Sequence, residues 1–300
     1  MDKKSALYAV MLSELPRVGD STAARILKRN RERRQTLTAF FRLPEAVLRD
    51  DYELHAETIQ RICYERADHE ARCQWLLDQF SGTGGQVLFV QDEAYPNLLR
   101  QRLMPGPAVL YGIGESSVLG GAKLAVLSSR DLTEQSVATT LALIQAAAAQ
   151  GFTVVSGGMK TNYRIAAVAG RAADAARIII LDRGIFATFG ARVEQDPFGF
   201  GPGRSTLRSD RTLVLSPFRL MNHAAAHNGR RRDELVAALA DVVVAVRARP
   251  SGEIERVCLA ALDRGQCVLS WYGENAGLVA AGAAVIDASN LNDLRRYAGR

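Results

Sequence analysis

Five short runs of apolar residues, each separated from the next by a segment long enough for a helix, constrain the fold more than any other feature of the sequence. The runs are almost continuously apolar, as is typical of strands buried on both faces of a parallel sheet. The intervening segments predict crossover helices. The sequence therefore favours an α/β fold with a Rossmann-like, doubly wound and mainly parallel sheet. The predicted strands are Lys123 to Ser129, Thr153 to Ser156, Arg177 to Leu181, Asp241 to Val246 and Gln266 to Trp271, and the predicted helices are Leu132 to Gln150, Asn162 to Ala176, Arg231 to Ala240 and Gly252 to Arg264.

The N-terminal part of the chain has a different pattern. From Asp2 to about Phe80 the apolar residues recur at helical spacing, and runs of β-branched residues are almost absent. Residues Ser81 to Gly85 read SGTGG, a composition that cannot sustain a helix. We therefore predict an all-helical domain of the helix-hairpin-helix or SAM-like type over residues 1–82 and the Rossmann-like domain over residues 83–300.

Composition excludes several classes of protein. Of 300 residues, 48% are hydrophobic and 23% are charged, which excludes a disordered chain or a coiled-coil rod. The apolar runs fall short of the roughly 20 residues that cross a bilayer, and the N-terminus does not resemble a secretory signal. The four cysteines contain no CxxC pair, so a reducing, cytoplasmic setting without a membrane partner is expected. The net charge of +6 favours polyanionic partners.

The first motif with a functional interpretation lies near the N-terminus. Residues Leu15 to Leu27 predict a tight hairpin followed by a helix that Asp20 or Ser21 would cap. This pattern resembles a helix-hairpin-helix, in which backbone amides at the hairpin hold a nucleic-acid phosphate. A helical hairpin with a solvated basic face is the alternative. The candidate contact residues are Arg17, Gly19, Arg25 and Lys28, with Arg17 where that motif usually has its first glycine.

A second set of candidates follows the predicted strands. Open α/β sheets bind ligands at the carboxyl ends of their strands, and three turns there combine small residues with charged ones. Small residues let backbone amides approach an anion at a helix start. A single turn of this kind is explained by packing alone, but three at one edge predict a phosphate-binding rim. Its residues are Ser128, Ser129, Arg130, Ser156, Gly157, Gly158, Lys160, Ser251 and Gly252.

Several segments, in this order, resemble the DNA-processing protein A, or Smf, family. Tyr95 to Leu99 (YPNLL) is similar to the family's YPxxL run, and Lys123 to Arg130 (KLAVLSSR) to its AVVGSR strand and turn. Val154 to Gly158 (VVSGG) matches the start of VSGxAxGID, and Leu239 to Val244 (LADVVV) lies where LSDAVVV is expected. The resemblance covers about Leu12 to Asp287.

The resemblance implies a function. Members of the family are cytoplasmic bacterial proteins with an extended Rossmann fold that bind single-stranded DNA and help to load RecA during natural transformation. By this resemblance, Arg130, Lys160 and the cluster Arg230, Arg231 and Arg232 would contact phosphates, and Asn228 would line the same cleft. A RecA-type recombinase and a second copy of the chain are further candidate partners. We expect a divergent member without the C-terminal winged-helix domain that many members have.

Departures from the family pattern leave alternatives open. Ser128 stands where the family has a glycine, Thr161 to Tyr163 replace its GID continuation, and Asp233 and Glu234 follow Arg232 where the family has an RNR segment. A nucleotide-binding sensor, or an enzyme similar to the Lonely Guy phosphoribohydrolases, is therefore the alternative, and a protein-interaction scaffold is a third interpretation. No catalytic residue or cofactor is predicted. His223 and His227 have the spacing of two metal ligands on a helix but no evident third partner, so no metal is predicted.

Overall fold

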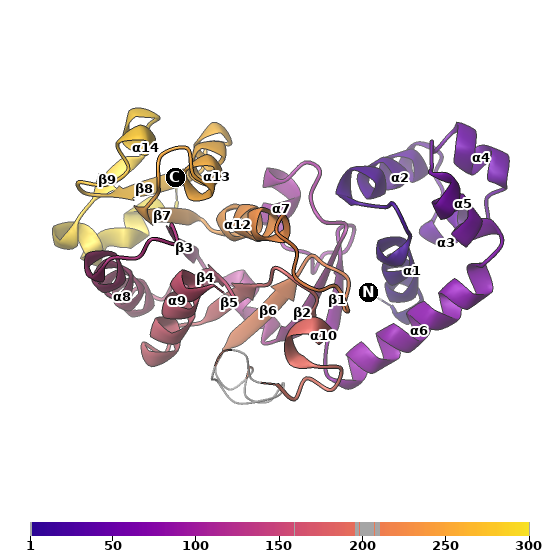
Figure 1. Ribbon diagram of the computed structural model, residues 1–300, viewed down its shortest axis with the longest axis horizontal. Coiled ribbons are helices and arrows are strands. Elements are labelled where there is room, and N and C mark those ends of the chain that lie inside the picture. Colours follow the sequence, from indigo (N-terminus) through magenta and orange to yellow (C-terminus); the bar gives the residue numbers. More distant parts are fainter. Residues whose placement is uncertain (1, 159, 196–197, 199–206, 208–210, 300) are drawn as a thin grey trace. The chain divides into compact units, whose positions relative to one another are not determined.

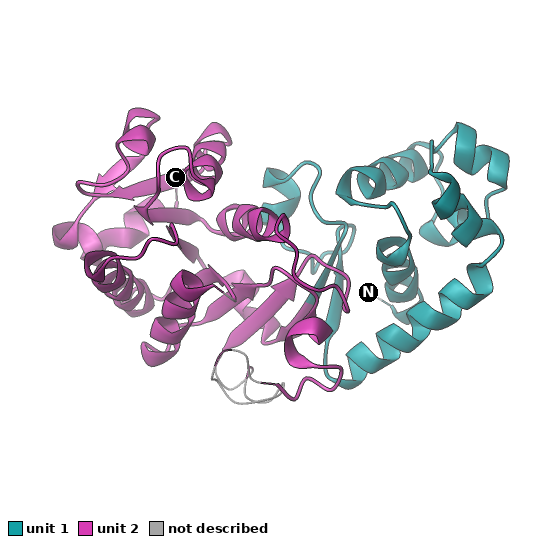
Figure 2. Cartoon of the chain, in the orientation of Figure 1, with its two compact units in different colours: residues 1–111 teal, residues 112–300 magenta. Residues whose placement is uncertain are grey.

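The computed structural model describes residues 2–158, 160–195, 198, 207 and 211–299. The chain folds into two compact units, Met1–Tyr111 (unit 1) and Gly112–Arg300 (unit 2), which Figure 2 distinguishes by colour. Among the described residues, no helix is long and apolar enough to cross a membrane.

Unit 1 is mainly helical, as predicted. The side chains of Leu12, Phe40, Tyr52 and Phe80 are fully buried in it. Helix α6 ends at Gly82, where the SGTGG segment lies, although the compact unit continues to Tyr111. The division into domains at residue 82 therefore stays a prediction. The elements of this unit are α1 (Lys3–Glu14), α2 (Asp20–Glu32), α3 (Leu37–Phe40), α4 (Glu45–Asp50), α5 (Ala56–Cys63), α6 (Arg66–Gly82), β1 (Gln86–Phe89) and α7 (Asn97–Arg102).

Unit 2 alternates strands and helices. It contains all five predicted strands and all four predicted helices, each within a few residues of the predicted bounds. The elements are β2 (Val109–Gly114), which begins in unit 1, η1 (Ser116–Gly120), β3 (Lys123–Ser128), α8 (Glu134–Ala149), β4 (Thr153–Gly157), α9 (Thr161–Ala172), β5 (Arg177–Ile180), α10 (Ile185–Phe189), β6 (Thr212–Ser216), α12 (Asn228–Leu239), β7 (Val242–Arg247), α13 (Glu253–Asp263), β8 (Cys267–Trp271), α14 (Ala276–Ala280), β9 (Ala284–Ile286) and η2 (Ala288–Tyr297).

The sheet confirms the predicted Rossmann-like architecture. Its strand order is β1-β2-β6-β5-β4-β3-β7-β8-β9, and all neighbours from β6 to β9 in that order pair in parallel. Helices α8 and α9 cover one face of the sheet, and α12 and α13 cover the other (Figure 1). The chain runs outward from β3 in both directions, since β3 has β4 on one side and β7 on the other. This arrangement makes β3 and β7 the topological switch point, where open α/β sheets bind ligands.

The core explains why the strands were recognisable in the sequence. Leu124, Val154, Val244 and Leu269 of four adjacent strands pack in one cluster with Leu143 of α8. Helices on both faces leave each inner strand no solvent-facing side, and this removes the alternation of polar and apolar residues. Strands β1, β2, β6 and β9 were not predicted.

Candidate functional site

A cavity of about 500 Å³ opens in unit 2 at the switch point of the sheet. Its wall is built by the turns that follow β3, β4 and β7, together with the first turn of α12. These are the carboxyl ends of adjacent parallel strands, so segments far apart in the sequence converge there.

A backbone irregularity at the end of β3 allows hydrogen bonds between the turn after β3 and the turn after β7. The register between β3 and β7 shifts after Leu127, so that Ser128 lies opposite Arg247, as at a β-bulge. The Ser129 amide then donates to the Arg247 carbonyl at 2.7 Å, and the Arg249 amide donates to Ser129 Oγ at 2.9 Å. As a result, Arg130 and Arg249, from different strand ends, both line the cavity.

Three helices begin at the cavity without a side-chain cap. The residues that precede α9, α12 and α13 are Lys160, His227 and Gly252, and none of these three caps its helix with a side-chain hydrogen bond. By contrast, α8, whose first residues do not line the cavity, begins with a complete capping box from Thr133 and Ser136. Uncapped amides at a helix start, with the positive end of the helix dipole, favour an anion.

Three cationic side chains in the cavity wall have no ion-pair partner among the residues that the structure describes: Arg130, Lys160 and Arg249. Both arginines are exposed, and Lys160 is half-buried. Burial, and then the nearby Arg232 guanidinium, lowers the pKa of Lys160 below its ordinary value. Gly229 leaves room for this ammonium group, because a Cβ there would lie 3.0 Å from Lys160 Nζ. The cavity thus holds uncompensated positive charge that an anion would neutralise.

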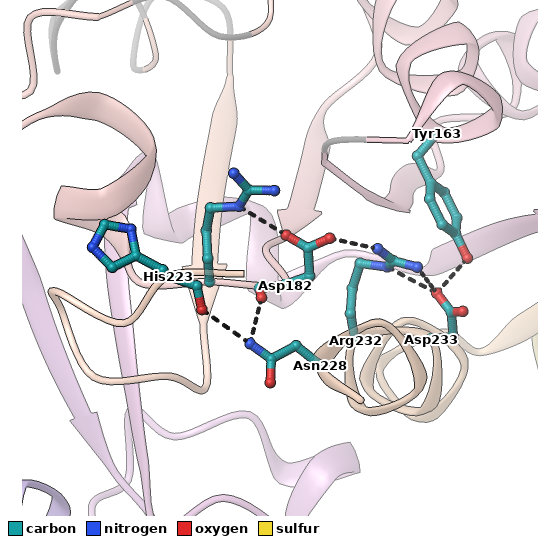
Figure 3. Close-up of polar contacts among 7 residues, drawn as sticks. Tyr163, Asp182, His223, Asn228, Arg232 and Asp233 are labelled. Carbon is teal, nitrogen blue, oxygen red and sulfur yellow. Dashed lines mark hydrogen bonds and ion pairs between the residues drawn. The ribbon is translucent and has the colours of Figure 1, made fainter. Parts of the chain in front are cut away.

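Arg232 has a different environment. Its side chain is fully buried, and its guanidinium lies between two carboxylates (Figure 3): Nη1 is 3.1 Å from Asp182 Oδ2 and Nη2 is 2.7 Å from Asp233 Oδ1. The guanidinium carbon is 4.7 Å from the centre of the Tyr163 ring, and the Tyr163 hydroxyl donates to Asp233 Oδ1 at 2.6 Å. Burial, and then the charge of Asp233, raises the pKa of Tyr163 well above its ordinary value, so this hydroxyl remains a donor. Arg232 is therefore a compensated part of the cavity wall.

Gly157 makes room for this network. A Cβ at Gly157 would lie 2.7 Å from both Arg232 Cδ and Tyr163 Cδ2, closer than non-bonded carbon atoms approach. Gly157 itself does not line the cavity. Its role here is to allow Arg232 and Tyr163 to pack over the end of β4.

Asn162 contributes an acceptor without a donor. Its Nδ2 group donates to the Ser128 carbonyl at 2.7 Å, and this bond fixes which end of the amide carries the oxygen. Asn162 Oδ1 is buried and has no hydrogen-bond partner. Leaving such a group unsatisfied costs about 1–3 kcal/mol, and the Oδ1 atom is buried beneath the cavity wall.

The structure divides the candidate rim into two groups. Arg230 lines the cavity but pairs with Glu234 at 3.0 Å and with Glu253 at 3.5 Å. Asn228 is buried and donates to the Asp182 carbonyl at 2.8 Å. Ser128, Ser129, Arg130, Lys160, Arg230, Arg232 and Gly252 line the cavity, whereas Ser156, Gly157, Gly158, Asn228, Arg231 and Ser251 do not.

Sequence reasoning did not propose Arg249, Asn162 or Tyr163 as site residues. Arg249 directly precedes the Pro250 to Gly252 turn, and its place beside that predicted turn is the sequence feature that could have identified it as a site residue. In the sequence, Asn162 and Tyr163 stood out only as departures from a family pattern. Such a departure does not show where a side chain points. His223 and His227 are exposed, and the described residues contain no group of three His, Cys, Asp or Glu that could hold a metal ion.

In unit 1, the hairpin candidates mostly carry ion pairs. Arg17 has a left-handed backbone (φ 57°) and pairs with Glu57 at 2.8 Å. The predicted cap was wrong, because the residue that precedes α2 is Gly19; Asp20 is already helical. Nucleic-acid contact by this hairpin stays a prediction. The other two candidates also pair, Arg25 with Glu53 at 3.3 Å and Lys28 with Glu32 at 4.0 Å.

A mainly parallel sheet with helices on both faces and a cavity at its switch point defines the class of Rossmann-like α/β proteins, in which ligands bind at the carboxyl ends of the strands. Within this class, the sequence matches the DNA recombination-mediator protein A family over residues 86–286. The chain therefore belongs to this family of DNA-processing proteins, as its sequence resemblance predicted.

Two solved structures support the fold. DNA processing protein A from Streptococcus pneumoniae has a TM-score of 0.71 at 16% sequence identity and covers 97% of this chain and 97% of its own chain. DNA processing protein A from Helicobacter pylori, described for its single-stranded DNA binding mode, has a TM-score of 0.54 at 22% identity and covers 71% of this chain and 96% of its own. A search of curated proteins finds no match.

Proposed function

We propose that the protein binds single-stranded DNA through the cavity of unit 2, with phosphate held by Arg130, Lys160 and Arg249. The observation that carries this proposal is the convergence of these three unpaired cations with the uncapped starts of α9, α12 and α13. Membership of a DNA-processing family supports the choice of DNA among polyanions. The Helicobacter pylori relative, described as binding single-stranded DNA, supports it further.

No step of this function requires catalysis. The proposed role is to bind a strand and to assist a RecA-type recombinase in DNA uptake or recombination in the bacterial cytoplasm. Contact through the helix-hairpin-helix of unit 1 and assembly into a homodimer are further parts of the proposal, each to be tested separately.

A nucleotide-binding sensor is the second candidate. The observation in its favour is the size of the cavity, which at about 500 Å³ falls in the range of small-molecule sites. In this function the same cations would bind the phosphate of a free nucleotide.

The test is equilibrium binding of a fluorescent thymidine oligonucleotide at several salt concentrations. DNA binding predicts an affinity that falls steeply with salt and that Arg130→Ala weakens. Arg296→Ala is the matched control, because Arg296 lies in η2 of the same unit, pairs with Asp293 at 3.2 Å and does not line the cavity. An oligonucleotide that binds no better than a mononucleotide would favour the sensor, and no binding of either would contradict both functions.

A further inference from the structure

A groove of about 390 Å³ lies within unit 1, between the helices α1 and α6 and the strand β1 (Figure 1). Its lining residues all fall between Asp2 and Ala94, so they belong to unit 1 alone. Leu77 of α6 and Leu88 of β1 contribute buried apolar side chains to its wall. The groove shares no residue with the cavity of unit 2.

The groove is acidic, although the chain as a whole has a net charge of +6. Asp2, Asp78 and Asp92 line it, and Lys3 is the one basic residue among its described lining residues. None of these carboxylates has an ion-pair partner in the part of the chain that the structure describes. One oxygen of Asp92 is buried without a hydrogen bond, so the protein does not compensate the charge of this carboxylate. The groove therefore repels phosphate and attracts a cation.

Strand β1 offers a second binding feature. It stands at one end of the strand order, so one of its edges has no neighbour among the described strands. Gln86, Val87 and Leu88 all line the groove. Because successive side chains of a strand point to opposite faces, a groove lined by three consecutive residues runs along the edge of the strand. Backbone N–H and C=O groups on such an edge can pair with an added extended chain.

Trp75 lies beside the groove. It stands between Gln74 and Asp78 in the sequence of α6, both of which line the groove, and it is 58% exposed. An accessible indole ring is a surface on which an ammonium or guanidinium group can stack. Tryptophan is also enriched among the residues that contribute most to protein–protein binding. An exposed tryptophan next to uncompensated carboxylates therefore indicates a basic protein partner.

We propose that this groove binds an extended, basic peptide segment of a partner protein. The segment adds to the edge of β1 as a further strand, and one of its lysine or arginine side chains lies among Asp2, Asp78 and Asp92, with Trp75 beside it. Main-chain hydrogen bonds supply affinity in this mode of recognition, and the side-chain contacts supply specificity. A nucleic acid does not fit the groove, because its phosphates would meet the carboxylates. The interaction is independent of the DNA binding proposed for unit 2.

The experiment measures the binding of fluorescent peptides to the full chain by anisotropy, without nucleic acid. The probes are short peptides in which lysine or arginine alternates with valine. Control peptides have glutamate in place of the basic residues, or methyl groups on the backbone amides. We expect the basic peptides to bind at least about tenfold more tightly than the acidic ones. Methylation, which prevents strand pairing, should remove most of the affinity. Hydrogen exchange at Gln86–Phe89 should slow when a basic peptide binds.

Variants locate the charge recognition. Asp78→Asn and Asp92→Asn should each weaken the binding of a basic peptide about threefold, the effect of a partly exposed ion pair, and the double variant should weaken it further. Asp68→Asn is the matched control, because Asp68 is exposed on α6 but does not line the groove. This control should bind the basic peptides as the wild type does.

The inference is overturned if no basic peptide binds, if the acidic peptides bind as tightly, or if the double variant binds a basic peptide no more weakly than Asp68→Asn. Methylated peptides that bind as tightly as the unmodified ones also overturn it, as does unchanged hydrogen exchange at Gln86–Phe89. If the double variant does not fold, the comparison of basic and acidic peptides on the wild-type protein still decides, because it needs no variant. Oligonucleotide binding is measured separately, so failure of the peptide assay leaves the proposed function intact.

Discussion

The salt dependence of DNA binding offers the sharpest test of which basic side chains in the cavity contact phosphate. Each phosphate contact with a single strand contributes a slope of about −0.7 in a plot of log affinity against log salt concentration. Because Arg130, Lys160 and Arg249 have no ion-pair partner among the described residues, the cavity should contribute a slope of about −2. This corresponds to a loss of affinity of about fifteenfold between about 50 and about 200 mM salt.

Arg249→Ala should therefore make the slope less negative by about 0.7, and Arg249→Lys should restore it. The assay is fluorescence anisotropy of a labelled thymidine oligonucleotide, repeated over a series of salt concentrations for each variant. Arg296→Ala, outside the cavity, is the control and should leave the slope unchanged. A slope that Arg249→Ala does not change, or that Arg296→Ala changes equally, would refute the assignment of Arg249 to a phosphate contact.

Three further predictions concern the stability of the cavity wall. Gly157→Ala should destabilise the fold by about 1–3 kcal/mol, measured by urea unfolding, because the added methyl group has no room beside the Arg232 side chain. Asp233→Asn should cost about 3–5 kcal/mol in the same assay, since it leaves the buried arginine only partly compensated. The control Glu234→Gln, which removes one carboxylate of a partly exposed ion pair, should cost less than about 1 kcal/mol. Lys160→Met should be more stable than the wild type at neutral pH but bind oligonucleotide more weakly.

The sign of the last effect follows from the pKa of Lys160, which burial lowers. The folded state binds this proton less tightly than the unfolded state does, so the stability of the wild type rises with pH through the interval between the lowered pKa and the ordinary value. The advantage of Lys160→Met should therefore shrink as the pH rises toward that ordinary value. An advantage that is constant with pH would contradict this explanation. For Gly157→Ala, an unfolding midpoint equal to that of the wild type would contradict the argument from packing against Arg232. For Asp233→Asn, an unchanged midpoint would contradict the argument from charge compensation.

Much of the fold was predictable because a strand that is buried on both faces has a recognisable local sequence. Strands such as β5 and β7 are covered on both faces, and their continuous runs of isoleucine and valine predict this environment directly. The strands that were not predicted include β9, which has three residues, two of them exposed. So short a run carries no periodicity that distinguishes it from a loop.

The position of the candidate site was predictable from the sequence. Which of its charged side chains have ion-pair partners was not. The sequence alone determined the parallel sheet, its ligand-binding edge and the presence of Arg130 and Lys160 there, because strand ends and small-residue turns are local features. It could not determine that Arg232 is compensated by Asp182, 50 residues away in the chain, or that Arg249 is not compensated. Charge compensation depends on distances of a few ångströms between side chains of different elements, and only the tertiary structure decides those distances.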